Sequence, residues 1–215
     1  AVILDMDGLI INTEETYCFA WRQAALAMGY EISEPFFQSL CGLHYQSVES
    51  KISEACGPGL QLDQFRRLSG EIWRNYVAQH GIEIRKGLFQ LLDVIKRESL
   101  KYCLATNSLE HNANECLSIA GIRDLFSTVI ARDHVKSGKP SPDLFFKASE
   151  KLNVPISDCL IVEDSYTGLQ AARNAGAFCV LIPSIQPVDP ATASMADLIL
   201  NDLAELSDEI EAKFT

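Results

Sequence analysis

The sequence predicts an α/β fold: a Rossmann-like core of parallel β-strands covered by helices, with a helical segment inserted after the first strand. Two observations carry this prediction. From Lys101 onward, short apolar runs alternate with helical patterns, and residues 12–84 contain no convincing strand. Alternating strands and helices are typical of a parallel sheet, and the near-continuous apolar character of the runs indicates strands buried on both faces.

The predicted elements of the core are bounded by polar residues and glycines. The expected strands are AVIL (1–4), KYCLA (101–105), FSTVIA (126–131), CLIVE (159–163), AFCVLI (177–182) and ADLIL (196–200). Helices are expected over 110–120, 142–152 and 165–175, with a last helix from Asp202. Gly121 and Gly176 follow two of these helices, and glycine commonly ends a helix. Residues 1–11 and 85–215 are therefore expected to form one α/β domain.

Residues 12–84 are expected to form a separate helical domain. Apolar and aromatic residues recur there at helical spacing, in one set formed by Trp21, Ala24, Ala25 and Met28 and another formed by Ile72, Trp73, Tyr76, Val77 and His80. Glycines at 57, 59 and 81 mark breaks between the helices. A structureless connection of this length is uncommon in a compact domain, which favours a small helical bundle.

Composition excludes several classes of protein. The net charge of −11, from 18 basic and 29 acidic residues, argues against a broad surface for nucleic acid or for an anionic membrane. The seven cysteines are odd in number and form no C-x-x-C pair, which indicates reduced thiols in a cytoplasmic protein. The longest apolar run, AFCVLI, is too short to cross a bilayer. Glycine-rich nucleotide-binding motifs are also absent from the sequence.

Polar residues follow four of the predicted strands. They are Asp5 and Asp7 after the first strand, Thr106, Asn107 and Ser108 after the next, KSGKPSPD (136–143) after the third, and Glu163, Asp164 and Ser165 after the fourth. In open parallel sheets, ligands bind beyond the carboxyl ends of the strands. The four segments are therefore expected to meet in one site.

Each segment also has a purely structural interpretation. The D-x-D-G stretch can be a turn, and Asn107 and Glu110 have the spacing of a helix capping box. GKPSPD can be a proline-stiffened surface loop, and Ser165 can cap the following helix. The occurrence of all four segments at successive strand ends favours a shared functional site over these four separate explanations.

The acidic residues suggest a magnesium site. Side chains alternate along a strand, so Asp5 and Asp7 can both face one pocket, and Glu163 and Asp164 add further oxygen atoms. Carboxylates, backbone carbonyls and water are the ligands that Mg²⁺ prefers. A bound Mg²⁺ would let acidic groups and a negatively charged phosphate lie side by side.

The remaining polar residues suit phosphoryl transfer. Thr106 and the N–H groups at the start of the following helix can hold phosphate oxygens, and Lys139 can pair with phosphate and with a nucleophile. An aspartate such as Asp5 can attack phosphorus to form an aspartyl-phosphate. Asp7 can protonate the leaving oxygen and then accept a proton from the hydrolytic water.

With these motifs placed, the sequence resembles the haloacid dehalogenase superfamily, and within it the phosphatases that carry a helical cap. The resemblance rests on DMDG, LATNS, GKPSPD and VEDSYTG in this order, and the insertion after DMDG lies where such proteins carry the cap. It implies a Mg²⁺-dependent, aspartyl-phosphate-forming enzyme acting on a small phosphorylated metabolite. The resemblance implies that Asp5 is the nucleophile and Asp7 the general acid and base. It implies phosphate binding by Thr106, by the N–H of Asn107 and by Lys139. It also implies Mg²⁺ binding by Asp5, the Asp7 carbonyl and Asp164, with Glu163 close by or bridging through water.

Within this superfamily the chain is most similar to β-phosphoglucomutases and sugar-phosphate phosphatases. The resemblance places Tyr17 where the mutases carry a cap histidine, and GLHYQS from Gly42 lacks their cap arginine. These differences favour a phosphatase of small phosphomonoesters, with sugar phosphates as expected substrates. His44 and Arg74 are candidate cap contacts.

Three alternatives to a phosphatase are open. A hexose-phosphate mutase would use the same aspartyl-phosphate, and a catalytically silent binding protein could share the scaffold. A signalling receiver domain is disfavoured, because its acidic pair, acceptor, hydroxyl and lysine follow another order and no large helical insertion follows its first strand.

Overall fold

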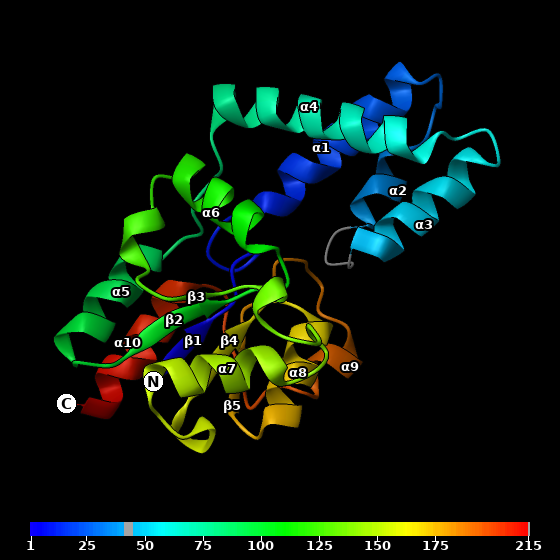
Figure 1. Cartoon of the computed structure of the whole chain (residues 1–215). Helices are drawn as coiled ribbons and strands as arrows, with labels where there is room; N and C mark the ends of the chain where they lie inside the picture. The colour runs from blue at the N-terminus through cyan, green and yellow to red at the C-terminus, as the bar shows by residue number, and fades with distance from the viewer. Residues whose placement is uncertain (41–44, 215) are drawn as a thin grey trace. The chain divides into compact units, whose positions relative to one another are not determined.

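The computed structural model describes residues 1–40 and 45–214, which form two compact units (Figure 1). One unit comprises residues 12–82 and is helical. The other comprises residues 1–11 and 83–215 and contains the β-sheet. We call them the helical unit and the sheet unit.

The sheet unit is built on six parallel strands. They are β1 (Val2–Leu4), β2 (Tyr102–Ala105), β3 (Val129–Ile130), β4 (Leu160–Glu163), β5 (Phe178–Leu181) and β6 (Leu198–Ile199). Their spatial order is β3-β2-β1-β4-β5-β6, so β1 lies between β2 and β4. The strand order changes direction at β1, and such a point is where open α/β sheets bind ligands.

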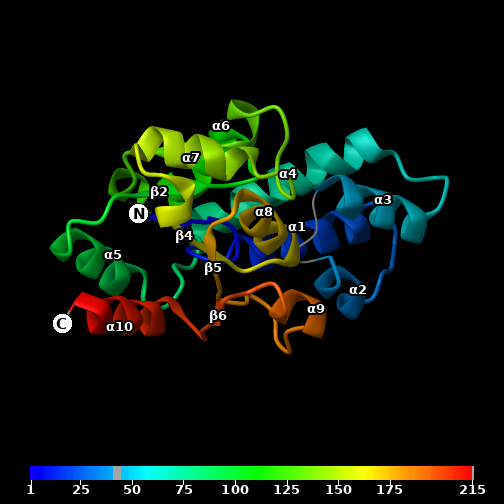
Figure 2. The same ribbon diagram turned by 90° about the horizontal axis from the view of Figure 1, so that it is seen from below.

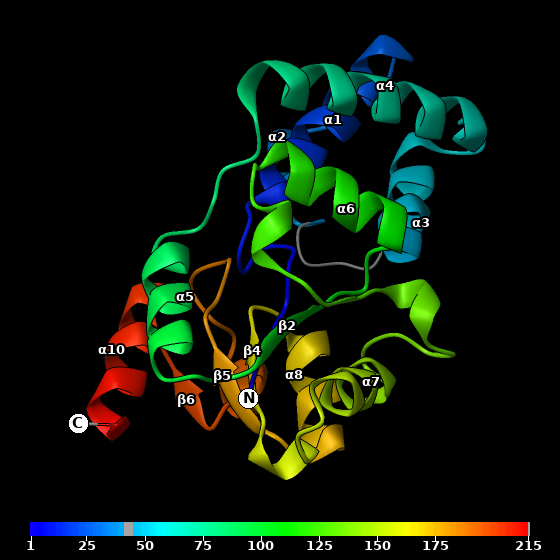
Figure 3. The same ribbon diagram turned by 60° about the vertical axis from the view of Figure 1, so that its left-hand side comes forward.

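Helices cover both faces of this sheet. They are α5 (Leu88–Arg97), α6 (Glu110–Ile119), α7 (Asp143–Leu152), α8 (Tyr166–Ala175), α9 (Pro190–Ala193) and α10 (Leu203–Phe214). Figure 3 shows α5 and α10 on one side of the strands and α7 and α8 on the other. On the α7 and α8 side, Leu144, Phe145 and Leu169 pack against strand residues such as Ile3 and Leu181. Burial of these apolar side chains stabilises the sheet and fixes the strand ends in space.

The α5 and α10 helices pack against each other, as Figure 2 also shows. Gly87, directly before α5, has φ +89°, and a Cβ there would lie 2.1 Å from the backbone nitrogen of Ala204. Only glycine combines this backbone conformation with so close an approach. The sequence did not predict α5, although Leu88, Leu91, Leu92 and Ile95 form a buried stripe at helical spacing.

The helical unit contains α1 (Thr13–Ala27), α2 (Glu34–Gln38), α3 (Tyr45–Cys56) and α4 (Leu62–His80). Ala24, Ala25, Ile52 and Phe65 are among the residues of its core. The Trp73 indole N–H donates a 2.9 Å hydrogen bond to the Thr16 hydroxyl, which joins α4 to α1. Because this bond satisfies a buried polar group, the two helices can pack without leaving an unpaired donor.

The predicted fold class is confirmed: a parallel α/β sheet with a helical segment inserted after β1. Ser165 caps α8 as expected, because its hydroxyl accepts from the Gly168 N–H at 3.1 Å. The interpretation of Asn107 and Glu110 as a capping box is wrong. Helix α6 begins after Leu109, and the Glu110 N–H donates to the Asp133 carboxylate rather than to Asn107. In the part of the chain that the structure describes, the cysteines are free thiols. None of the helices described there is long and apolar enough to cross a membrane.

Removing the cap of α10 should destabilise the sheet unit. One carboxylate oxygen of Asp202 accepts from the N–H groups of Ala204 and Glu205 at 2.9 and 3.0 Å, and the other pairs with Lys86 at 2.6 Å. We expect Asp202→Ala to lower the free energy of unfolding by about 1 kcal/mol, measured by urea denaturation.

Asp208→Ala in the same helix is the control for this measurement. Asp208 accepts a 3.3 Å hydrogen bond from exposed Gln90, so its removal should change stability by no more than about 0.5 kcal/mol. Equal losses in the two variants would contradict a capping role for Asp202.

Candidate active site

The carboxyl ends of β1 and β4 bring three acidic side chains together. Leu4 lies opposite Val162 in the sheet register, so Asp5 and Glu163 follow side by side, with Asp164 next to them. Oxygen atoms of Asp5, Glu163 and Asp164 lie within 4.8 Å of one another, and all three residues are buried. So dense a group of acids needs positive charge nearby if more than one of them is to be ionised.

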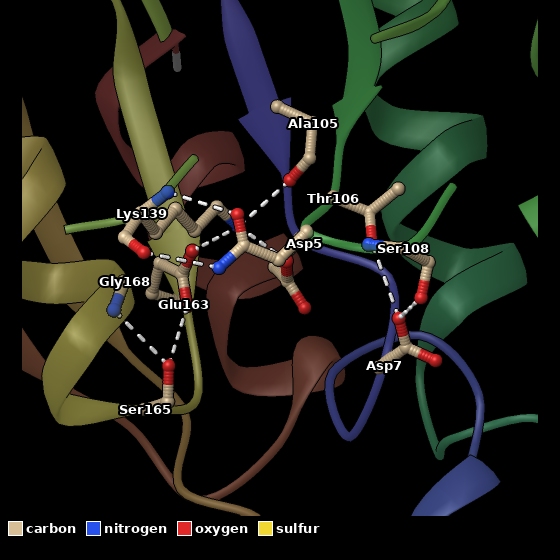
Figure 4. Close-up of polar contacts among 10 residues, drawn as sticks. Asp5, Asp7, Ala105, Thr106, Ser108, Lys139, Glu163, Ser165 and Gly168 are labelled. Carbon is tan, nitrogen blue, oxygen red and sulfur yellow. Dashed lines mark hydrogen bonds and ion pairs between the residues drawn. The ribbon is translucent and has the colours of Figure 1, made fainter. Parts of the chain in front are cut away.

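Lys139 supplies one positive charge at this point (Figure 4). Its ammonium group donates hydrogen bonds to Asp5 and, at 2.7 Å, to the carbonyl of Ala105. It also lies 2.6 Å from Glu163 Oε1 in an ion pair, a contact that does not have hydrogen-bond alignment. Burial lowers the pKa of this ammonium, but Asp5 and Glu163 outweigh burial and raise the pKa above its ordinary value.

For the pKa of Asp5, burial outweighs the effect of the charged partner. Burial raises the pKa of Asp5 well above its ordinary value, Lys139 lowers it, and the neighbouring Glu163 and Asp7 raise it again. One ammonium thus does not offset the burial of this carboxyl group. A further positive charge next to Asp5 would favour its ionised form.

Two glycines allow the acids to approach the backbone. A Cβ on Gly168, in the first turn of α8, would lie 1.9 Å from Glu163 Oε2. A Cβ on Gly8 would lie 2.1 Å from Asp164 Oδ2, and Gly8 also has φ +82°. Side chains at either position would displace a carboxylate of the cluster. Gly168 was not predicted from the sequence as a site residue, although it belongs to the VEDSYTG motif.

Asp7 lies on the other side of Asp5, towards the end of β2 (Figure 4). Its Oδ2 accepts hydrogen bonds from the hydroxyls of Thr106, at 3.1 Å, and Ser108, at 2.8 Å. The Thr106 hydroxyl also accepts from the Ser108 N–H at 2.9 Å. Ser108 follows a strand in the sequence, but only the fold shows that its hydroxyl reaches Asp7.

The side chain of Asn107 points to the loop that carries Lys139. Asn107 Oδ1 accepts from the Lys139 N–H at 2.8 Å, and Nδ2 donates to the Lys139 carbonyl at 3.2 Å. The structure thus brings all the predicted site residues of the four strand-end segments to one edge of the sheet. Within it, Asp7 with Thr106 and Ser108 forms one group, and Asp5 with Lys139, Glu163 and Asp164 forms the other.

Comparison with known proteins assigns the chain to a family. Residues 2–182 match the sequence pattern of the haloacid dehalogenase-like hydrolases. The chain belongs to this family. The match begins at β1 and extends to the end of β5, so it contains every residue of the site described above. This haloacid dehalogenase-like chain is accordingly an enzyme of the hydrolase class.

Its relatives in this family include enzymes of two activities. The chain is 30% identical over 176 residues to a phosphorylated carbohydrates phosphatase from Thermotoga maritima, covering 82% of this chain and 81% of that protein. It is 28% identical over 216 residues to the beta-phosphoglucomutase of Bacillus subtilis, covering 98% and 92%. A crystal structure of CbbY from Rhodobacter sphaeroides in complex with phosphate superposes with a TM-score of 0.74, at 27% identity and 95% coverage of both chains.

Adding a methyl group at Gly168 should disturb this site of the haloacid dehalogenase-like fold. The new Cβ would overlap the buried Glu163 carboxylate, and overpacking of this kind typically costs about 1–3 kcal/mol. We expect Gly168→Ala to lower the free energy of unfolding by that amount, measured by urea denaturation.

Gly70→Ala is the matched control, because Gly70 is also inside a helix. The nearest atom to a Cβ there is Nη1 of Arg74 at 3.6 Å, an ordinary contact with a flexible side chain. Alanine has a higher helix propensity than glycine, so this variant should gain up to about 1 kcal/mol. Stabilisation of both variants would show that Glu163 does not need the space at Gly168.

Proposed function

We propose that the protein is a Mg²⁺-dependent phosphatase that hydrolyses small phosphomonoesters, with sugar phosphates as substrates, through an aspartyl-phosphate. The observation that carries the proposal is the position of Asp5, buried after the central strand β1, paired with Lys139 and close to the Asp164 carboxylate. The similarity to a phosphatase of phosphorylated carbohydrates supports the substrate class.

Asp5 is the proposed nucleophile. One of its carboxylate oxygens attacks phosphorus, and the bond between phosphorus and the ester oxygen breaks as the acyl phosphate forms. Water then attacks the same phosphorus and releases inorganic phosphate, which returns the Asp5 carboxylate. The pairing of Asp5 with Lys139 supports this role, because the ammonium holds the carboxylate in one orientation.

Asp7 is the proposed general acid and base. It donates a proton to the ester oxygen as that oxygen leaves, and it takes a proton from the attacking water in the second step. The Thr106 and Ser108 hydroxyls hold the Asp7 carboxylate through one oxygen, Oδ2. We infer that this contact fixes the orientation of Asp7 before substrate binds.

The acidic cluster fits a magnesium ion. Three buried carboxyl groups lie together, and the Lys139 ammonium pairs with two of them, Asp5 and Glu163. Their donor atoms are oxygen, and burial disfavours the ionised form of Asp5. Asp5, Asp164 and the backbone carbonyl of Asp7 would hold the ion, with Glu163 close by or bridging through water. When bound, Mg²⁺ would neutralise negative charge on the carboxylates and on the phosphate.

Phosphate would be bound at the ends of β1 and β2. We propose contacts from Thr106, Lys139 and the N–H groups of Met6, Asp7 and Asn107. Lys139 already donates to Asp5 and Ala105 and pairs with Glu163, so its contribution is chiefly a fixed positive charge next to the attacking oxygen.

The helical segment is the proposed cap of the enzyme. We propose a cap domain of residues 12–84 and a core domain of residues 1–11 and 85–215. Movement of such a cap over a site at the strand ends would limit substrates to small molecules and exclude water during the reaction.

Asparagine at position 5 should abolish turnover. Asp5→Asn keeps the size of the side chain but removes the nucleophilic carboxylate, so phosphate release from p-nitrophenyl phosphate and sugar phosphates should fall at least about 10³-fold. Asp93→Asn, at an exposed position of α5, is the control and should keep wild-type activity. Full activity in Asp5→Asn would refute the nucleophile assignment.

Removal of divalent cations should inactivate the enzyme reversibly. We expect EDTA to stop phosphate release and added MgCl₂ to restore it, because the clustered carboxylates otherwise repel a phosphate. Asp164→Asn should raise the Mg²⁺ concentration for half-maximal activity by about tenfold or more. Undiminished activity in EDTA would overturn the metal requirement.

A hexose-phosphate mutase is the second candidate, because a beta-phosphoglucomutase matches nearly the whole chain. The resemblance places Tyr17 where the mutases carry a histidine, and Tyr17 stacks on the rings of Trp21 and Trp73 with centroid distances of 5.9 and 5.2 Å. This neutral aromatic stack offers no basic group for a second phosphate. Gly42 and His44 lie outside the described residues.

Phosphorus NMR with a hexose monophosphate separates the two candidates. Hydrolysis predicts that inorganic phosphate accumulates in equal amount to the substrate consumed. A mutase predicts an isomeric hexose phosphate with little free phosphate, and that outcome would replace the phosphatase assignment.

A further inference from the structure

Asn107 makes two hydrogen bonds to the backbone of a single residue far along the chain. Its Oδ1 accepts from the Lys139 N–H at 2.8 Å, and its Nδ2 donates to the Lys139 carbonyl at 3.2 Å. A side-chain amide that pairs with both polar groups of one residue fixes the position of that residue's backbone as well as its orientation. The Asn107 side chain thus contacts Lys139 rather than capping α6.

The two ends of Lys139 are therefore held separately. Asn107 holds the backbone, while Asp5, Ala105 and Glu163 hold the ammonium group. The residue is buried along its length, and its ammonium also lies 5.1 Å from the centre of the Phe145 ring. A shift of the Lys139 backbone would move the ammonium out of this arrangement, because the buried side chain is packed on all sides and has little freedom to compensate.

Gly138 provides the space that this contact needs. A Cβ at Gly138 would lie 2.4 Å from Asn107 Oδ1 and 2.5 Å from Cδ of Arg132. Arg132 in turn donates from its backbone N–H to the Ser108 carbonyl at 3.0 Å, a further link between the same two loops. The segment after β2 and the loop that carries Lys139 are thus fitted to each other at Gly138.

We propose that Asn107 is a positioning residue for Lys139: its amide sets the Lys139 backbone so that the ammonium lies between Asp5 and Glu163. This inference rests on the proposed function for its effect on turnover. It also assigns Asn107 two separate contributions, a backbone N–H directed to phosphate and a side chain that acts through Lys139.

Asn107→Ala isolates the side-chain contribution, because alanine keeps the backbone N–H. We expect kcat/KM for p-nitrophenyl phosphate to fall about 10- to 100-fold, as for other changes that misplace a reacting group. Gly138→Ala should lower kcat/KM to a similar extent, since its Cβ would displace the Asn107 oxygen.

Asn174→Ala is the matched control. Asn174 is exposed, and its Nδ2 donates at 3.3 Å to the carbonyl of Pro140, the residue that follows Lys139. The variant removes an asparagine hydrogen bond to the same loop without touching Lys139, and kcat/KM should stay within about twofold of wild type. An equal loss here would show that any bond to this loop matters and would overturn the specific role of Asn107.

A double-mutant cycle with Lys139→Ala tests whether Asn107 acts through Lys139. We expect Asn107→Ala to change kcat/KM by less than about twofold when Lys139 is already alanine. If the two losses multiply instead, Asn107 acts independently of Lys139 and the proposal is wrong. Wild-type kcat/KM in the single variant Asn107→Ala would refute it as well.

A crystal structure of Asn107→Ala separates this inference from the proposed function. The expected result is a shifted Lys139 whose ammonium no longer lies within hydrogen-bond distance of Asp5. An ammonium that keeps its contacts with both Asp5 and Glu163 overturns the positioning role. This reading does not depend on activity, so an inactive wild-type enzyme would contradict the phosphatase assignment alone.

Discussion

The buried ammonium group of Lys139 is the constraint around which the site is arranged. It pairs with Asp5, which directly follows β1, and with Glu163 at the end of β4, and it hydrogen bonds to the last carbonyl of β2. The carboxyl ends of the neighbouring strands β2, β1 and β4 therefore meet at the Lys139 ammonium group. Removing a single partner from such a buried group leaves charge without compensation, which is far more costly than the pair itself is stabilising.

Three glycines around the site let its polar side chains pack closely against the backbone. Gly8, Gly138 and Gly168 each lie where a Cβ would overlap a site carboxylate or the Asn107 amide. Hydroxyls and backbone N–H groups satisfy the surrounding oxygens, as Ser108 does for Asp7. The absence of side chains at three positions is thus as important to the geometry as the presence of the acids.

The sequence was sufficient to predict the parallel sheet, the inserted helices and the four polar segments, because short apolar runs, helical periodicity and the polar residues after each strand are local signals. It did not reveal which atoms would meet. Asn107 and Glu110 have the spacing of a capping box, yet Asp133 from another loop takes the Glu110 N–H, and Asn107 contacts Lys139. Gly168 and Ser108 could not be assigned either, since their importance depends on the direction of side chains distant in sequence.

The position of β1 at the centre of the sheet has a consequence for how the chain folds. Its two neighbours, β2 and β4, are made roughly 100 and 160 residues later, and Asp5 is separated from Lys139 by 134 residues. During synthesis, β1 is therefore made well before β2 and β4 and stays unpaired until they follow. Contacts of such long range are slow to form, so an unpaired β1 exposes an apolar strand edge that favours aggregation until β2 and β4 are made.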